Sequence, residues 1–85
     1  MEIRIQAIHF DVTERLDAFI RKKVAKLSQY HDGILDAEVI LRVVKPETAR
    51  NKQAGIRLQI KSNDCFAEKV SDTFEEAVDE AVVAL

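Results

Sequence analysis

The sequence predicts an α+β fold: a β-α-β-β-β-α two-layer sandwich, in which a four-stranded mixed sheet carries two helices on one face. Several segments alternate apolar and polar residues, as half-buried strands do, and two others have helical periodicity. The chain has 85 residues, of which 47% are hydrophobic, with only two Gly and one Pro. This length and composition are typical of one regular domain, so we expect residues 1–85 to form a single domain.

The first strand and the first helix are expected within residues 2–30. Residues 2–8 alternate, which is the pattern of a strand with one buried side. Thr13 is the expected N-cap, because its hydroxyl can accept from the free N–H groups of the first helical turn. The helix is expected to end near Tyr30, since Gly33 tolerates the left-handed conformation that follows many helices.

The first helix combines an apolar face with one-sided positive charge. At 100° per residue, its apolar side chains fall within roughly 80° of Leu16. Arg15, Lys22 and Lys26 fall together on one flank, and Lys23 lies nearer the edge of the core. One-sided charge is what a binding surface requires, although a solvated helix face gives the same pattern.

The second strand is expected at residues 34–45, where apolar and polar residues alternate again. Pro46 ends this strand because proline has no N–H to donate to the ladder. Residues 45–54 are polar and are expected to form a mobile loop carrying Lys45, Arg50 and Lys52.

A hairpin and a second helix complete the chain. Residues 55–61 and 65–70 are the expected third and fourth strands, with turn chemistry in residues 62–64. Thr73 followed by Glu76 fits a capping box, and the helix that follows has an acidic outer face.

These elements define two layers. The first helix serves as a right-handed crossover that lets strands one and two pair in parallel, while strands two to four are antiparallel neighbours. Both helices have one apolar face, so they are expected on the same side of the sheet. The open side is then expected to expose Arg4, Gln6, Arg42, Arg57, Gln59 and Lys61.

Several classes of protein do not fit the sequence. Two glycines cannot build a phosphate-binding loop or a nucleophile elbow, and His9 and His31 are not set at metal-ligand spacing. Cys65 is the single cysteine, which excludes an internal disulfide and favours a small core residue. No apolar run approaches a membrane span and no signal peptide is evident. We therefore expect a cytoplasmic protein that is not an enzyme and has no cofactor, metal, membrane partner or small-molecule substrate.

The remaining pattern in the sequence is the distribution of charge, which indicates binding to a polyanion. Residues 1–62 hold 12 Lys and Arg against 8 Asp and Glu, a balance of +4, and residues 63–85 hold 1 against 7, a balance of −6. Lysine and arginine contacts to phosphates give salt-dependent affinity without sequence specificity. Tyr30 could stack on a base or cap the end of the core. The candidate RNA-binding residues are Arg15, Lys22, Lys23, Lys26, Tyr30, Arg42, Lys45, Arg50 and Lys52.

The sequence resembles the ribosome hibernation promoting factor / ribosome-associated inhibitor A family, also called the sigma-54 modulation protein family. The resemblance covers essentially all 85 residues. It is carried by IRIQAIHFDVTERL, FIRKKVAKLSQYHDGI, AEVILRVVK, GIRLQIKSNDCFAEKVSDTF and AVDEAVVAL in this order. The most specific part is KK-x-x-K-L-x-x-Y directly before the second strand.

The resemblance implies the same β-α-β-β-β-α fold and a function. Family members bind the 30S ribosomal subunit near its decoding centre, where they occlude the messenger and transfer RNA sites. The resemblance therefore implies a translation inhibitor that contacts 16S ribosomal RNA under stress or in stationary phase. Lys23, Lys26 and Tyr30 fall on the family's helix-end pattern, and Arg42 and Lys45 fall on its basic positions in strand two. The alternative is a protein-interaction module that modulates the transcription apparatus, as the older family name suggests.

The sequence also departs from the family pattern. The second helix of the family usually continues into a basic tail, whereas this chain closes at Leu85. Glu75 stands where an aromatic residue is common, and Lys69 replaces a small residue. RNA contacts from the second helix are therefore expected to be reduced. We expect no C-terminal dimerisation domain of the kind that long members carry, so the resemblance does not imply ribosome dimerisation by that route.

Overall fold

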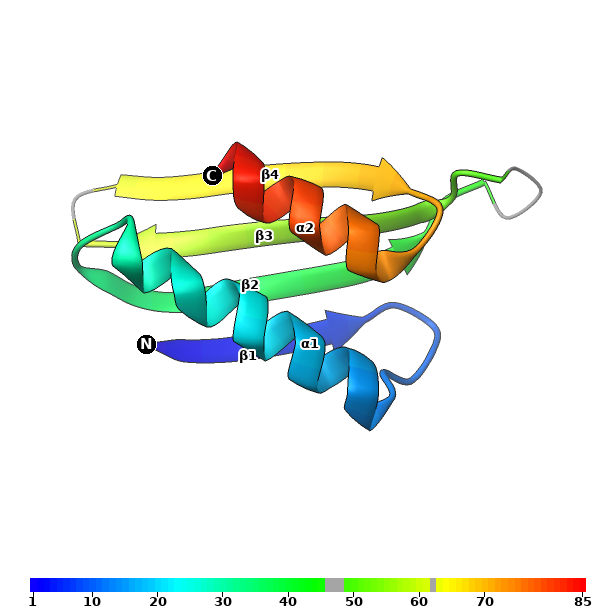
Figure 1. Cartoon of the computed structure of the whole chain (residues 1–85), viewed down its shortest axis with the longest axis horizontal. Coiled ribbons are helices and arrows are strands. Elements are labelled where there is room, and N and C mark those ends of the chain that lie inside the picture. Colours follow the sequence, from blue (N-terminus) through cyan, green and yellow to red (C-terminus); the bar gives the residue numbers. More distant parts are fainter. Residues whose placement is uncertain (46–48, 62) are drawn as a thin grey trace.

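A four-stranded sheet is covered on one face by two helices (Figure 1). The computed structural model describes residues 1–45, 49–61 and 63–85. The elements in chain order are β1 (Glu2–Ala7), α1 (Glu14–Ala25), the 3₁₀ helix η1 (Lys26–Gln29), β2 (Ile34–Val43), β3 (Lys52–Ile60), β4 (Asn63–Ser71) and α2 (Phe74–Ala84). The predicted α+β class, the order of elements and the placement of both helices on one face are confirmed.

The strands lie in the order β1-β2-β3-β4. β1 and β2 are parallel, with Ile5 opposite Val39, and the other two pairings are antiparallel. As expected, α1 provides the long crossover that a parallel pair needs. One end of the molecule, here called the loop end, therefore holds the ends of β1, β2 and β4, the start of β3 and the starts of both helices (Figure 1). The opposite end, the hairpin end, holds the β3–β4 connection and η1.

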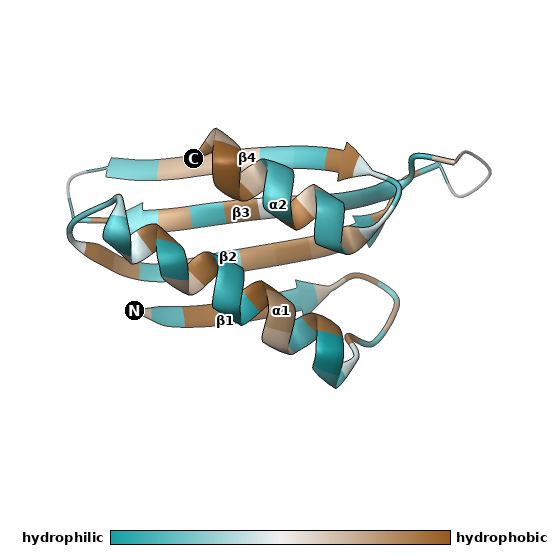
Figure 2. Cartoon of the chain, in the orientation of Figure 1, coloured by the Kyte–Doolittle hydropathy of each residue, from teal (hydrophilic) through white to brown (hydrophobic). Residues whose placement is uncertain are grey.

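The core lies between the helices and the sheet. Apolar and polar residues alternate along the strands and around the helices, so each element buries one side (Figure 2). The largest fully buried apolar side chains are Ile20 and Val24 of α1, Val39 and Leu41 of β2, Ile56 and Leu58 of β3, and Val78 of α2. Each such side chain contributes roughly 1.5–3 kcal/mol relative to an exposed one. Ala77 and Ala81 are also fully buried, and their small size lets α2 lie close to the sheet.

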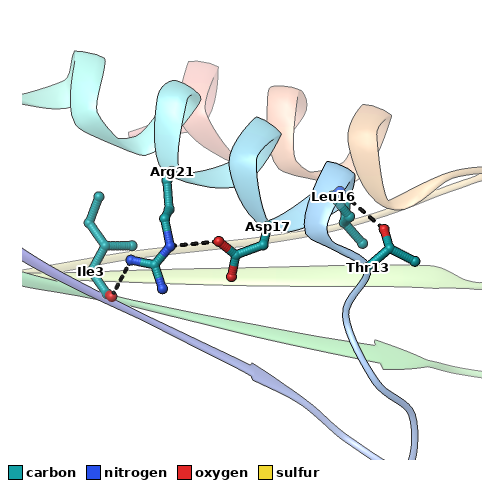
Figure 3. A network of polar contacts seen from close by, with 5 residues as sticks. All are labelled: Ile3, Thr13, Leu16, Asp17 and Arg21. Atoms are coloured by element: carbon teal, nitrogen blue, oxygen red, sulfur yellow. Dashed lines mark hydrogen bonds and ion pairs between the residues drawn. The ribbon is translucent and has the colours of Figure 1, made fainter.

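Both helices begin with the predicted threonine caps. The Thr13 hydroxyl accepts a hydrogen bond from the Leu16 N–H at 3.1 Å (Figure 3), and the Thr73 hydroxyl accepts from the Glu76 N–H at 3.1 Å. The Glu76 carboxylate accepts from the Ser71 hydroxyl at 2.7 Å. The second cap therefore fixes the end of β4 to the first turn of α2.

The first helix is also tied to the edge of the sheet. The Arg21 Nε lies 2.7 Å from the Asp17 carboxylate, and its Nη1 donates to the Ile3 carbonyl at 3.0 Å (Figure 3). Edge strands carry unpaired backbone groups that invite pairing with another chain. Arg21 occupies one such carbonyl of β1.

The helix expected to reach Tyr30 changes type before that residue. α1 ends at Ala25 and continues as η1, whose last turn is closed by a bond from the Tyr30 N–H to the Leu27 carbonyl at 3.0 Å. The Ser28 hydroxyl donates to the Ala25 carbonyl at 2.9 Å, so it occupies an acceptor at the end of α1. Gly33 then adopts the predicted left-handed conformation, with φ 77°.

The hairpin strands are longer than predicted. β3 begins at Lys52 and not at residue 55, because the Val44 N–H donates to the Asn51 carbonyl at 2.8 Å and Val43 pairs with Lys52. Residues 52–54, expected in a mobile loop, therefore belong to the sheet. β4 begins at Asn63, which pairs with Ile60, and not at residue 65. β2 ends at Val43, two residues before its predicted end at residue 45. Two expectations, the stop imposed by Pro46 and the turn role of Ser62, lie outside the described residues.

Candidate nucleic-acid interface

The positive flank of α1 is present in the structure. Arg15, Lys22 and Lys26 are exposed, and the helical rise between the first and last of them is about 16 Å. Among the described residues, neither Lys22 nor Lys26 has an ion-pair partner. Lys22 and Lys26 are four residues apart, so they lie as neighbours one turn apart and can contact a single anionic chain. Both also lie near the negative end of the α1 dipole, which their charges partly offset.

Lys23 differs from its two neighbours. Its Nζ lies 3.0 Å from an oxygen of Asp79 on α2 and 5.5 Å from the ring centre of Phe19. Its side chain is only 32% exposed. Lys23 therefore links the two helices, and its charge is largely compensated within the protein.

Tyr30 projects into solvent beside this flank. The residue is 78% exposed, so the alternative that it caps the core is wrong. Its side chain lines a groove of about 440 Å³ between η1 and the end of α2, with Lys26 on the same wall and Val83 opposite. His31 closes this groove, since its Nε2 lies 3.1 Å from the Leu85 carbonyl oxygen. An aromatic side chain next to uncompensated lysine charge is a suitable surface for an unpaired base and its phosphate.

The other candidate residues lie at the loop end (Figure 1). Arg42 is exposed on the open face of the sheet, and Lys45 is exposed with φ 49°. Arg50 donates weakly to the Val70 carbonyl at 3.4 Å, and Lys52 donates to the Asn51 side chain at 2.6 Å. The nine candidates therefore form two groups: Lys22, Lys23, Lys26 and Tyr30 near the hairpin end, and Arg42, Lys45, Arg50 and Lys52 at the loop end, with Arg15 in the first turn of α1.

The six residues predicted to be exposed with the open face of the sheet are all exposed, but this face is not a basic surface. The strand register places five carboxylates and three arginines on it: Glu2, Asp36, Glu38, Asp64 and Glu68 with Arg4, Arg42 and Arg57. Arg4 lies 3.6 Å from Asp36, and Glu38 is paired in register with both Arg4 and Arg57. The charged strand side chains of this face therefore sum to −2, which disfavours contact of its central part with phosphates. Arg42 differs, because it lies at the loop end opposite the uncharged Gln53.

Sequence reasoning missed the apolar wall beside Tyr30. Val83 is 87% exposed, and together with Leu27 and Val82 it lines the groove. The available signal was the outward position of Val83 on the helical wheel of α2, but nothing local placed that position next to Tyr30. The wall exists because α1 and α2 run side by side on the sheet.

The described residues offer no sign of a metal centre or of a helical membrane span. Among them, no three His, Cys, Asp or Glu side chains are grouped in a way that could hold a metal ion. None of the helices in the described part of the chain is both long and apolar enough to cross a membrane. Cys65 is a partly buried free thiol.

Comparisons with known proteins agree with this architecture. The chain matches the family described as sigma 54 modulation protein / S30EA ribosomal protein over residues 3–85. The N-terminal domain of protein Y from Thermus thermophilus is similar with a TM-score of 0.83 and 25% identity, covering 99% of this chain and 90% of that one. A ribosomal subunit interface protein from Coxiella burnetii has a TM-score of 0.86 at 19% identity, covering 99% and 88%, a likeness of fold alone. A comparison with curated proteins found no match.

The family match covers all but the first two residues, and the structure has the expected element order. The chain belongs to the sigma 54 modulation protein / S30EA ribosomal protein family.

Proposed function

We propose that the protein is a ribosome-associated translation inhibitor, a hibernation factor that binds 16S ribosomal RNA of the 30S subunit near the decoding centre. Family membership supports association with the ribosome, and the name of the Coxiella burnetii neighbour refers to the ribosomal subunit interface. The carrying observation is the exposed pair Lys22 and Lys26 beside the exposed Tyr30. The proposal places the protein in the cytoplasm, acting under stress or in stationary phase.

In this proposal, α1 contributes most of the affinity. Lys22 and Lys26 neutralise backbone phosphates, and Tyr30 stacks on an unpaired base next to them. These contacts read the shape and charge of structured RNA and carry little sequence information. Inhibition then follows from occupancy alone, because a protein bound near the decoding centre excludes messenger and transfer RNA. No catalytic group is required.

Co-sedimentation with purified 30S subunits tests the proposal. Binding should fall as salt rises, because each neutralised phosphate releases counterions. Lys22→Glu combined with Lys26→Glu should abolish pelleting, because it replaces two phosphate contacts with negative charge.

The matched control is Arg57→Glu combined with Lys61→Glu. It makes the same change in net charge at exposed positions at the hairpin end, on the open face and in the turn after β3. This control should still pellet. Unchanged pelleting by the Lys22 and Lys26 variant would contradict the site. Equal loss of pelleting in both variants would show that the overall charge of the protein, and not the position of these lysines, determines binding.

A second candidate function is a protein-interaction module acting on the transcription apparatus. The observation that favours it is the acidic outer side of α2, where Glu75, Asp79 and Glu80 leave little affinity for RNA. This candidate predicts a protein partner that remains bound in pull-downs after nuclease treatment. Loss of all partners on nuclease treatment would contradict it.

A further inference from the structure

A second groove lies at the loop end, away from Lys22 and Tyr30. Its walls come from three segments that are distant in the sequence: the residues after β1, the end of β2 and the first residue of α2. Figure 1 shows these segments meeting at one end of the molecule. The groove has a volume of about 590 Å³, which is within the range of small-molecule sites.

The interior of this groove is apolar and partly aromatic. Phe10 and Phe74 stack with ring centres 5.1 Å apart and an interplanar angle of 18°, and both remain partly exposed. Val43, the last residue of β2, is 39% exposed and also lines the groove. A flat, apolar ligand would cover these side chains without requiring the core to open.

The rim of the groove carries one cationic side chain, Arg42. Of the residues that line it, Arg42 and His9 are the polar ones, and none is a carboxylate. Within the described part of the chain, no ion pair involves Arg42. His9 has φ 67°, a left-handed conformation that is unfavourable for a residue other than glycine and is found preferentially at functional sites. The groove therefore favours a ligand that joins an apolar ring to an anion.

We infer that this groove holds an unpaired nucleobase, with the base against Phe10, Phe74 and Val43 and the adjacent phosphate on Arg42. This inference rests on the proposed function, because it names a second contact for the same RNA. Bases of single-stranded segments stack readily on aromatic side chains, and arginine contacts the neighbouring phosphate. An apolar side chain of a protein fits the interior equally well, but it brings no anion for Arg42.

The site also explains why the basic residues form two groups. α1 contacts the backbone near the hairpin end, and Arg42 contacts it near the loop end. The molecule is 40 Å in its longest dimension, so the two contacts address well-separated parts of a folded RNA. Two separated contacts on a rigid scaffold select RNA of matching shape.

A short single-stranded RNA with one central 2-aminopurine tests the inference. Its fluorescence should be quenched on binding, because 2-aminopurine loses emission when it stacks. Val43→Glu places a carboxylate in the groove and should weaken binding by roughly 5- to 150-fold. Arg42→Ala should weaken binding and lower the salt dependence by about one phosphate contact, a slope change of about 0.7.

Two matched controls make the result specific. Leu35→Glu changes a 56% exposed apolar residue at the other end of β2, and Arg57→Ala removes an arginine of the same open face. Both controls should bind the probe as the unmodified protein does. Far-UV circular dichroism should show that all four variants are folded.

Several outcomes would overturn the inference. They are unchanged binding by Val43→Glu and Arg42→Ala, binding without quenching, or competition by N-acetylphenylalanine amide but not by adenosine monophosphate. If such a result appears while 30S pelleting still depends on Lys22 and Lys26, the base site is wrong and the proposed function stands. If the unmodified protein binds neither the probe nor 30S subunits, both are wrong.

Discussion

The two helices of this protein share a scaffold and differ in their outer surfaces. Both begin at a threonine cap, both lie on the same face of the sheet, and they have 12 and 11 residues. One exposed flank of α1 carries Arg15 and Lys22, and Lys26 follows on the same flank at the start of η1. In contrast, α2 carries Glu75, Glu76, Asp79 and Glu80, with no basic residue in its last turn. The buried faces are therefore constrained by the same sheet, while the outer faces are free to differ.

This difference indicates which surfaces of the helices stabilise the fold and which one is suited to binding. The buried side of each helix stabilises the fold, and the outer side of α1 alone is suited to a polyanion. The pair Lys23–Asp79 joins the two surfaces, with 3.0 Å between the ammonium nitrogen and the carboxylate oxygen. An acidic α2 thus reduces the RNA-binding charge of α1 by occupying one of its lysines.

The largest expected effect concerns the buried side of α1. Ile20→Ala should lower the free energy of unfolding by about 2–5 kcal/mol, because Ile20 is fully buried and its loss leaves a cavity. Val83→Ala on α2 should change it by less than about 0.5 kcal/mol, since Val83 is 87% exposed. Urea unfolding followed by circular dichroism measures both values. Similar losses of unfolding free energy in the two variants would mean that burial does not determine how much Ile20 and Val83 contribute to stability.

The next effect compares the two caps. Thr13→Ala and Thr73→Ala each remove the acceptor of one N–H at 3.1 Å, so each should cost about 1 kcal/mol. Thr→Ser at either position retains the hydroxyl and should restore most of the stability. A much smaller loss at Thr73 would indicate that the Ser71–Glu76 bond already holds the start of α2.

The smallest effect on stability comes from the link between the helices. Asp79→Asn breaks a partly exposed ion pair and should cost at most about 1 kcal/mol. It also releases Lys23, so RNA binding should strengthen and the slope of log affinity against log salt should steepen by about 0.7–0.9. Fluorescence titration with a short RNA at several salt concentrations measures both.

Glu80→Gln is the control for this change. It removes the same charge from α2, and among the described residues Glu80 has no lysine or arginine partner. It should strengthen binding less than Asp79→Asn does. Equal gains would show that the overall charge of α2 matters and that the contact with Lys23 does not.

Local patterns are sufficient to predict most of the fold. Alternation predicts each strand, helical periodicity predicts the apolar faces, and the residues that follow Thr13 and Thr73 identify both as caps. These features depend on neighbours within about four positions in the chain. For the same reason, the amino-acid sequence alone is enough to place Arg15, Lys22 and Lys26 on one flank of the first helix.

Element boundaries are predicted less well. β3 begins at Lys52 because its pairing with Val43 continues the ladder, and a polar sequence does not reveal such pairing. The change from an α-helix to a 3₁₀ helix at Lys26 is also not predicted. It depends on the backbone hydrogen bonds of the last turn, which the residue types there do not specify.

The sequence by itself determined the order of elements, the buried faces and the charged flank of α1. Only the tertiary structure decided that Lys23 is paired with Asp79, that Tyr30 is exposed, that the strand residues of the open sheet face are net acidic, and that Phe10, Val43 and Phe74 line one groove. Each of these facts joins residues from different elements. Their proximity depends on strand register and helix packing, which are properties of the whole chain and not of any local pattern.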